Sequence, residues 1–373
     1  MPGVGFIRPA GGGAGGGGSV SVSVSDTTPT QGDTVTITAT PSGVTPSNYL
    51  FFYYDSATGT IQFLADQASN TFEWDITNFG TVDVFAIADD VYSNLQEIVI
   101  AVDPDAEAWL TANSFVNDAT IYNSTYGISG NDLYTALGDF FVALKSESGL
   151  YSKIHWAYLY FGSDANKAKL NLVNPADTDA AYRVTWSGGW VFNDEGRVSN
   201  GTNTYGNTHF NASTELSVND GFYGIYKRTP PTGGSPSAEW GAIDTAISIG
   251  NFFISKTTVD RSFYSLGVFK QVDGISPYFL DGFQSINRNN NANLQQWRGN
   301  DFGLMDSDTA AWVSNPNFTE FVGARNNSGT AFLFLENNTE VAFEIRADGL
   351  TTSQWNALHD AVNNLMLSLG WNV

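Results

Sequence analysis

The stretch Asp179–Asn211 constrains the fold more than any other, because it carries a two-residue period and no helical one. Apolar and polar residues alternate along Tyr182–Ser187, which gives one face to bury and one to expose, as in a β-strand. Gly188 and Gly189 interrupt this run before Trp190–Phe192 resume it, and this predicts a bulge or a tight corner. The Asn-, Thr- and Gly-rich remainder is typical of long loops on a β-scaffold.

Composition favours a mainly β protein. Glycine is abundant, with 38 residues among 373, while Lys and Arg together number 16, a balance that favours sheets and turns over helical bundles. Hydrophobic residues make up 42% of the chain, so large cores can form and wholesale disorder is excluded. At about 100–200 residues per domain, this length predicts two or three domains.

Residues 19–103 are predicted to form an immunoglobulin-like sandwich. About seven alternating runs are separated by turn-rich breaks such as Pro29–Asp33, and Pro104 punctuates the boundary that follows. Because the chain has no cysteine, its core must rely on apolar side chains alone: Phe51, Tyr53, Phe63, Trp74, Val84 and Ile100. We expect this sandwich to act as a spacer, with a weak adhesive module as the alternative.

Residues 107–373 are too long for another small sandwich and predict a larger one with two peripheral helices. Asn131–Ser146 carries apolar residues at helical spacing on one face. Strand-like runs dominate from Trp156 onwards. A second helix closes the chain; Thr351 or Thr352 can cap it and Gly370 suits the position after its end.

Several segments of this larger part resemble the C-terminal domain of structural proteins in tailed-phage particles. The residues that carry the resemblance are Asp179-Ala180-Ala181-Tyr182-Arg183, Ser187-Gly188-Gly189-Trp190, Asn200-Gly201-Thr202-Asn203, residues 321–332 and residues 349–370. The resemblance spans most of Asn113–Val373 and implies a concanavalin-like, lectin-type jelly-roll sandwich. It brings no catalytic residues with it.

Residues 1–18 are predicted to be a flexible attachment arm. The run Gly11–Gly18 is a glycine tether. Ahead of it, three apolar residues surround the only basic side chain before Lys145, and we interpret the group as a docking peptide for a larger assembly: Val4, Phe6, Ile7 and Arg8. A disordered leader without a partner is the alternative.

The net charge of −22 excludes two classes of partner. Nucleic-acid binding requires clustered Lys and Arg, and anionic membranes would be repelled in the same way. The N-terminus lacks the basic start and apolar run of a signal peptide, and no apolar stretch approaches the ~20 residues of a membrane helix. We therefore expect synthesis in a host cytoplasm and a final place in a virion.

No catalytic motif is recognisable, so the chain is predicted not to be an enzyme. A concanavalin-like hydrolase would need two carboxylates flanking a sugar bond. The nearest patterns are Asn193-Asp194-Glu195 and the run around Glu344, which alternates with Phe343 and Ile345 and is expected on a solvated face. Calcium would be the cofactor of a lectin-like sandwich, with loop residues as candidate ligands by type alone: Asp164, Asn166, Asp177, Asp179 and Asp194. The sequence predicts no other cofactor.

Aromatic residues on loops are the candidate glycan site, because sugar rings stack on Trp and Tyr faces while Asn binds hydroxyls. The candidates lie in or beside Asn/Gly-rich and Pro/Gly-rich stretches: Trp190, Tyr205, Trp240 and Trp297. For any one tryptophan, packing in a broad sandwich core is the alternative.

The sequence therefore predicts a virion structural protein, either a fibre or a capsid-decoration subunit. Its expected order is an attachment arm, a spacer and a lectin-like head that contacts host or environmental glycans. Other virion proteins would be its partners, and it could form a homo-oligomer. A polysaccharide depolymerase and a purely structural particle protein without a ligand are the alternatives.

Overall fold

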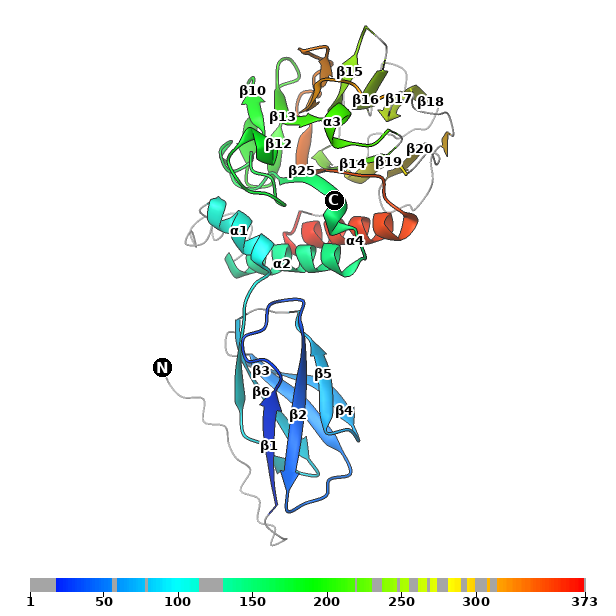
Figure 1. Cartoon of the computed structure of the whole chain (residues 1–373). Coiled ribbons are helices and arrows are strands. Elements are labelled where there is room, and N and C mark those ends of the chain that lie inside the picture. The colour runs from blue at the N-terminus through cyan, green and yellow to red at the C-terminus, as the bar shows by residue number, and fades with distance from the viewer. Residues whose placement is uncertain are drawn as a thin grey trace. The chain divides into compact units, whose positions relative to one another are not determined.

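The computed structural model describes the greater part of the chain, namely residues 18–55, 59–77, 80–113, 130–218, 220–229, 237–246, 249–254, 261–266, 269–273, 281–289, 294–298, 307–308 and 314–371. It divides into two compact units, Met1–Val102 and Asp103–Val373 (Figure 1). The proposed attachment residues Val4, Phe6, Ile7 and Arg8 lie outside the described residues.

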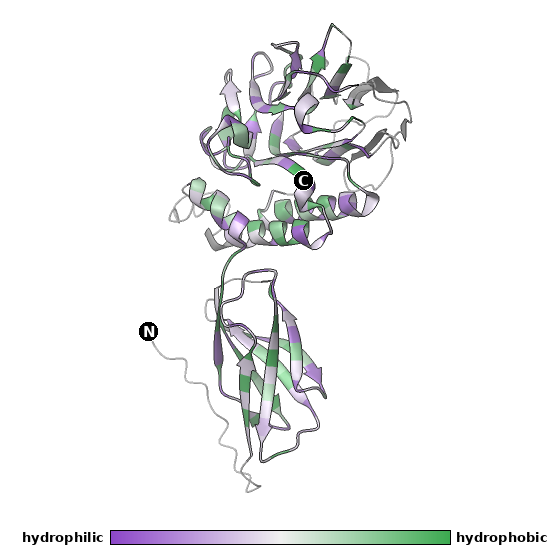
Figure 2. Cartoon of the chain, viewed as in Figure 1, coloured by the Kyte–Doolittle hydropathy of each residue, from purple (hydrophilic) through white to green (hydrophobic). Residues whose placement is uncertain are grey.

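The N-terminal unit is a sandwich of two antiparallel sheets. The smaller sheet has the order β1 (Ser19–Val24), β2 (Thr34–Ser42), β5 (Thr71–Asp75). The larger has the order β4 (Thr60–Gln67), β3 (Tyr49–Asp55), β6 (Gly80–Ala88), β7 (Val91–Tyr92), with β8 (Gln96–Ile100) also paired to β6. Hydrophobic and hydrophilic residues alternate along these strands (Figure 2), and the inward set is fully buried, as at Val35, Phe51 and Val84.

Phe63 is a correction to the predicted core of this unit. The register of the β3–β4 pair shifts between Phe51 and Phe52, so that Phe51 lies opposite Ala65 while Phe52 lies opposite Phe63. This bulge turns Leu64 and Ala65 towards the core. Phe63 therefore points outwards and is 59% exposed.

The C-terminal unit contains two larger sheets. One has the order β11 (Val191–Asn193), β12 (Gly196–Val198), β25 (Glu340–Ala347), β14 (Gly221–Thr229), β19 (Gly282–Arg288), β20 (Leu294–Arg298), β21 (Ser307–Asp308), with β9 (Ile154–Leu159) on β25. The other has the order β10 (Thr185–Ser187), β13 (Tyr205–Asn211), β22 (Thr319–Val322), β15 (Trp240–Asp244), β16 (Ile249–Ile254), β17 (Arg261–Leu266), β18 (Phe269–Asp273), extended by β23 (Arg325–Asn327) and β24 (Thr330–Phe332).

Two helices pack on the first of these sheets, which we call the helix-covered sheet. Helix α2 (Gly130–Ser146) and helix α4 (Thr352–Ser368) lie side by side (Figure 1). Phe140 of α2 meets Phe343 with ring centroids 5.8 Å apart. Trp355 of α4 meets Phe222 at 6.0 Å and donates from Nε1 to Ser285 Oγ at 2.8 Å. Both predicted helices therefore bury their apolar stripe against the sandwich.

The ends of these helices follow from local chemistry. Thr351 accepts a hydrogen bond from the Gln354 backbone while the Gln354 side chain accepts from Thr351, a capping box. Gly370 follows the helix with φ +69°, a conformation that glycine adopts freely. Helix α1 (Pro104–Ala112) was not predicted; Asp103 caps it and Pro104 is its first residue. A four-residue helix, α3 (Ala212–Glu215), follows β13.

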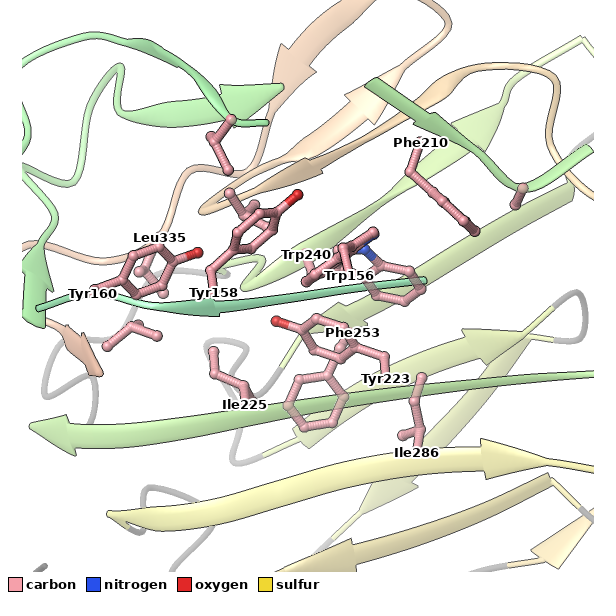
Figure 3. Close-up of a cluster of buried hydrophobic side chains, with 14 of the residues drawn as sticks. Trp156, Tyr158, Tyr160, Phe210, Tyr223, Ile225, Trp240, Phe253, Ile286 and Leu335 are labelled. Atoms are coloured by element: carbon pink, nitrogen blue, oxygen red, sulfur yellow. The ribbon is translucent and has the colours of Figure 1, made fainter. Parts of the chain in front are cut away.

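The core of the C-terminal unit lies between its two sheets. Strand β9 contributes Trp156 and Tyr158, which are fully buried among side chains from both sheets (Figure 3). Tyr223 of β14 stacks on Trp240 of β15 with ring centroids 4.4 Å apart, which joins the sheets face to face.

The predicted fold class is confirmed: the chain is mainly β, with sandwich architecture and short helices. Among the described residues, no helix is both long and apolar enough to cross a membrane.

Candidate functional site

The chain changes sheets within the Asp179–Asn211 stretch. Strand β10 belongs to the second sheet, whereas β11 and β12 belong to the helix-covered sheet, so residues 188–190 cross one side of the sandwich. Gly188 makes this turn at φ +82°, and a Cβ there would lie 2.2 Å from the Asn203 carbonyl oxygen. The corner predicted at Gly188 is therefore present, and only glycine fits it.

Trp190 is held at this side of the sandwich. Its Nε1 donates to the Tyr205 carbonyl at 3.2 Å, and its ring centroid lies 4.4 Å from the guanidinium carbon of Arg197. A Cβ on Gly323 would come within 2.5 Å of the indole, so a glycine is required beside the ring. These contacts fix the orientation of the indole, and Trp190 as a whole is partly buried.

Tyr205 begins β13 next to this tryptophan. Its ring stacks on Phe321 with centroids 4.8 Å apart and stays partly exposed. The alternation of side chains along a strand accounts for this placement. Gly206 and Phe210 of β13 are buried, and Tyr205 therefore lies on the opposite face.

A turn of amide side chains borders the two aromatic residues. Asn200 Oδ1 accepts from the backbone of Thr202 at 3.0 Å and of Asn203 at 3.2 Å. Asn203 Oδ1 accepts from Asn200 Nδ2 at 2.7 Å, and Asn203 is exposed. Among the described residues, none accepts a hydrogen bond from Asn203 Nδ2. We call Trp190, Tyr205, Asn200 and Asn203 the aromatic–amide rim.

Trp240 is a correction to the predicted glycan site. It is fully buried, stacks on Tyr223, and donates from Nε1 to Glu320 Oε2 at 3.0 Å (Figure 3). It has no face open to a ligand and belongs to the core. Trp297 lies in β20 opposite Ser285, and its side chain falls outside the described part of the structure.

Glu344 is a second correction, because it is fully buried instead of solvated. Its alternation with Phe343 was read correctly, but α2 covers the Phe343 face and the second sheet covers the Glu344 face. Glu344 Oε2 lies 2.5 Å from Arg197 Nη2 and accepts from the Tyr160 hydroxyl, while Oε1 accepts from the Tyr223 hydroxyl at 2.7 Å. Burial raises the pKa of both tyrosines well above 10, so each stays a donor.

A second buried ion pair lies beside the first. Arg346, two residues further along β25, contacts Glu320 of β22 through Nε at 3.1 Å and Nη2 at 3.2 Å. All four charged side chains are closed to solvent, and these carboxylates are unable to reach a sugar from outside. We call Arg197, Glu344, Arg346 and Glu320 the buried charge network.

Three of the candidate calcium ligands, Asp164, Asp177 and Asp179, make other contacts. Asp177 pairs with Lys169 at 2.8 Å and Arg183 at 3.0 Å, and hydrogen bonds from these two cations hold its pKa below the usual value. Asp179 pairs with Arg183 at 2.9 Å, and Asp164 Oδ1 accepts from the backbone of Asn166. Within the described ranges, no three His, Asp or Glu side chains converge as a metal site would require.

His209 of β13 lies close to Asp179, with 3.4 Å between Nε2 and Oδ1. Its Nε2 is also 2.8 Å from the Thr185 hydroxyl. Burial lowers the pKa of His209, and the neighbouring Asp179 carboxylate only partly opposes this effect. The ring is therefore held mainly in its neutral form near pH 7.

No protein-family model and no curated protein matches the chain. Among solved structures, it is similar to the fibronectin(III)-like modules of Clostridium thermocellum CbhA, with 20% identity over 23% of this chain and 46% of that one, at a TM-score of 0.18. The chain thus spans about half the length of that structure.

Two further structures cover more of the chain. Domain 4 of AbnA, an extracellular arabinanase from Geobacillus stearothermophilus solved with arabinotriose, is 12% identical over 56% of this chain and 98% of that one, at a TM-score of 0.34. Trypanosoma rangeli sialidase is 10% identical over 94% of this chain and 54% of that one, at a TM-score of 0.33. At these identities and TM-scores, the likenesses carry no argument about function.

Proposed function

We propose that the C-terminal unit binds glycans through the aromatic–amide rim. The observation that carries the proposal is that Trp190, partly buried and fixed in orientation, lies in the same rim as the exposed amide of Asn203. An indole face offers apolar area to the C–H side of a sugar ring, and an amide can satisfy its hydroxyls. Pre-fixed side chains lose little conformational entropy on binding.

Burial of Glu344 supports binding over hydrolysis. A retaining or inverting glycosidase needs two carboxylates that reach the sugar bond, whereas Glu344 is enclosed by Arg197, Tyr160 and Tyr223. The partly exposed rim supports a binding role over a purely structural one.

A glycan array probed with the full chain tests the binding role. Trp190→Ala should lose at least about tenfold in affinity for any glycan retained by the wild type, because truncating an aromatic anchor of a binding site costs on the order of 2 kcal/mol or more. Val191→Ala, at a neighbouring residue that is 60% exposed, is the matched control. An array without signal would contradict the proposal. Release of reducing sugars from the bound glycan would identify a hydrolase instead.

We further propose that the chain is a tailed-phage virion protein, a fibre or capsid-decoration subunit in which residues 1–18 attach to other virion proteins. The resemblance of residues 179–183, 187–190 and 200–203 to phage structural proteins supports this. A truncation that begins at Ser19 should fold normally and fail to join particles. Full occupancy of the truncated protein in purified particles would contradict the attachment role.

A further inference from the structure

A chemically reactive dipeptide lies in the aromatic–amide rim. Asn200–Gly201 is the single Asn–Gly pair in the sequence. The backbone nitrogen that follows an asparagine can attack the side-chain carbonyl carbon, which makes asparagine one of the thermolabile residues. Glycine in the second position favours this attack, because it has no Cβ to crowd the nitrogen. The rim therefore contains the dipeptide of this chain that is most prone to deamidation.

The fold requires a glycine at position 201. The φ of Gly201, +73°, lies in the left-handed region, which glycine adopts without strain. A Cβ there would come within 2.7 Å of the Asn337 backbone nitrogen and 2.9 Å of the Asn337 Cβ. A bulkier residue that would slow the attack does not fit here, so any protection of Asn200 has to come from hydrogen bonds.

The attacking nitrogen is held by a buried hydroxyl. The Gly201 backbone donates to Ser199 Oγ at 3.0 Å. Ser199 is 2% exposed, and its Oγ also donates to the Leu335 carbonyl at 2.6 Å and lies 2.7 Å from Thr204 Oγ1. The nitrogen becomes a nucleophile only after it loses its proton to solvent. Since this proton points at a buried oxygen, it is sheltered until the turn opens.

The side-chain amide of Asn200 is held as well. Its Oδ1 accepts from the backbone of Thr202 at 3.0 Å and of Asn203 at 3.2 Å, which fixes the orientation of the amide. Its Nδ2, the group that has to leave, donates to Asn203 Oδ1 at 2.7 Å. The nucleophile and the leaving group are thus each bonded to a neighbour while the turn is closed.

We propose that Asn200 is a modification site gated by this turn: it is stable while the turn is closed, and it deamidates when the turn opens. In the reaction, the Gly201 nitrogen forms a bond to Asn200 Cγ. The side-chain nitrogen leaves as ammonia, which takes up the equivalent of the proton that Gly201 has lost. Water then opens the cyclic imide and leaves aspartate or isoaspartate at position 200.

Either product alters the rim irreversibly. A carboxylate at position 200 has no N–H to donate to Asn203 Oδ1, so the 2.7 Å contact becomes one between two acceptors. Isoaspartate also lengthens the backbone by a carbon next to Gly201, where Asn337 leaves no space. A chain that has reacted cannot restore the original turn. An effect on glycan binding rests on the proposed function, whereas the modification itself does not.

Peptide mass mapping of the full chain, kept in warm and mildly alkaline buffer with or without urea, measures the reaction. We expect the folded chain to convert Asn200 at least about tenfold more slowly than the chain in urea, because local opening must come first. Hydrogen exchange at the Gly201 amide follows the same opening, and its protection should match the ratio of the two deamidation rates.

Two variants each remove one of these hydrogen bonds. Ser199→Ala releases the Gly201 proton and Asn203→Ala releases the leaving amide. Each should speed the reaction of the folded chain at least about threefold, the effect of losing one hydrogen bond, and leave the rate in urea nearly unchanged. Unchanged urea unfolding shows that a variant is folded, and the exposed Asn203 keeps the test decisive where the buried Ser199→Ala fails to fold. Ser213→Ala, which removes a hydroxyl bonded to Asn211, is the matched control and should react like the wild type.

Three results would overturn the proposal. They are an Asn200 that does not react even in urea, equal rates with and without urea, and a wild-type rate in either variant once it is shown to be folded. None of these measurements involves a glycan, so a failure of the proposed binding function leaves the test intact.

Discussion

Glutamine at position 344 tests the buried charge network with almost no change in shape. The substitution Glu344→Gln keeps the side-chain volume and one acceptor oxygen, and it removes the negative charge that lies 2.5 Å from Arg197 Nη2. Arg197 is fully buried, and two of its nitrogens, Nε and Nη1, have no hydrogen-bond partner among the described residues. The guanidinium would therefore stay charged in the interior with no counter-charge in contact.

The size of the effect follows from these contacts. Removing one partner of a buried ion pair costs about 3–5 kcal/mol. The amide can accept from only one of the two tyrosine hydroxyls, and a stranded hydroxyl adds about 1–3 kcal/mol. These losses overlap, and we expect the free energy of unfolding of the C-terminal unit to fall by about 3–6 kcal/mol. That is a large part of the ~5–15 kcal/mol typical of a whole domain.

Urea unfolding of the full chain, followed by tryptophan fluorescence, measures this loss. Trp74 is the only tryptophan before Asp103, so the signal reports mainly on the C-terminal unit. The double variant Arg197→Met/Glu344→Gln removes both charges and should recover most of the lost stability, because neutral replacement of a buried pair is often tolerated. A single variant as stable as the wild type, or a double variant no better than the single one, would refute the reasoning.

Three further predictions concern the same unit. Trp240→Ala should cost about 3–5 kcal/mol in urea unfolding, since the ring is buried between Tyr223 and Arg346; a loss under about 1 kcal/mol would place the ring outside the core. Leu365→Ala should cost about 2–5 kcal/mol, because this α4 residue is 1% exposed, and the exposed Leu367→Ala should cost almost nothing. The lowered pKa of His209 means that the unfolded chain binds its proton first, so stability should fall as pH drops through about 6.5. His209→Asn, which suits the φ of +59° there, should flatten that part of the pH profile, and an unchanged profile would assign the effect to other groups.

Periodicity was enough to predict most elements. The apolar spacing from Leu133 to Leu144 predicted α2, and Thr351 with Gly370 marked both ends of α4, because caps and turns are set by local chemistry. The same reasoning missed α1. Asp103 and Pro104 were interpreted as a boundary, although Asp followed by Pro also starts a helix.

The candidate site was harder to predict because burial depends on distant partners. The alternation of apolar and polar residues correctly placed Glu344 on the face opposite Phe343. It could not show that the second sheet covers that face, because this sheet is formed by distant parts of the chain. The Pro/Gly-rich sequence before Trp240 suggested a loop, whereas Trp240 begins β15 and meets Tyr223 of the other sheet. Trp190 and Tyr205, by contrast, stay partly exposed where local sequence already predicted a corner.

The pairing of β9 with β25 sets the timing of folding. These neighbours in the helix-covered sheet come from opposite ends of the C-terminal unit, with Tyr158 opposite Glu344. During synthesis on the ribosome, β9 emerges long before β25 is made. The helix-covered sheet can therefore form only when nearly the whole chain has been synthesised, whereas the N-terminal unit can fold earlier. Long-range pairing of this kind is slow. A chain truncated before β25 would lack this strand and helix α4. Its C-terminal unit could not complete the helix-covered sheet, so we expect proteases to degrade such truncated products.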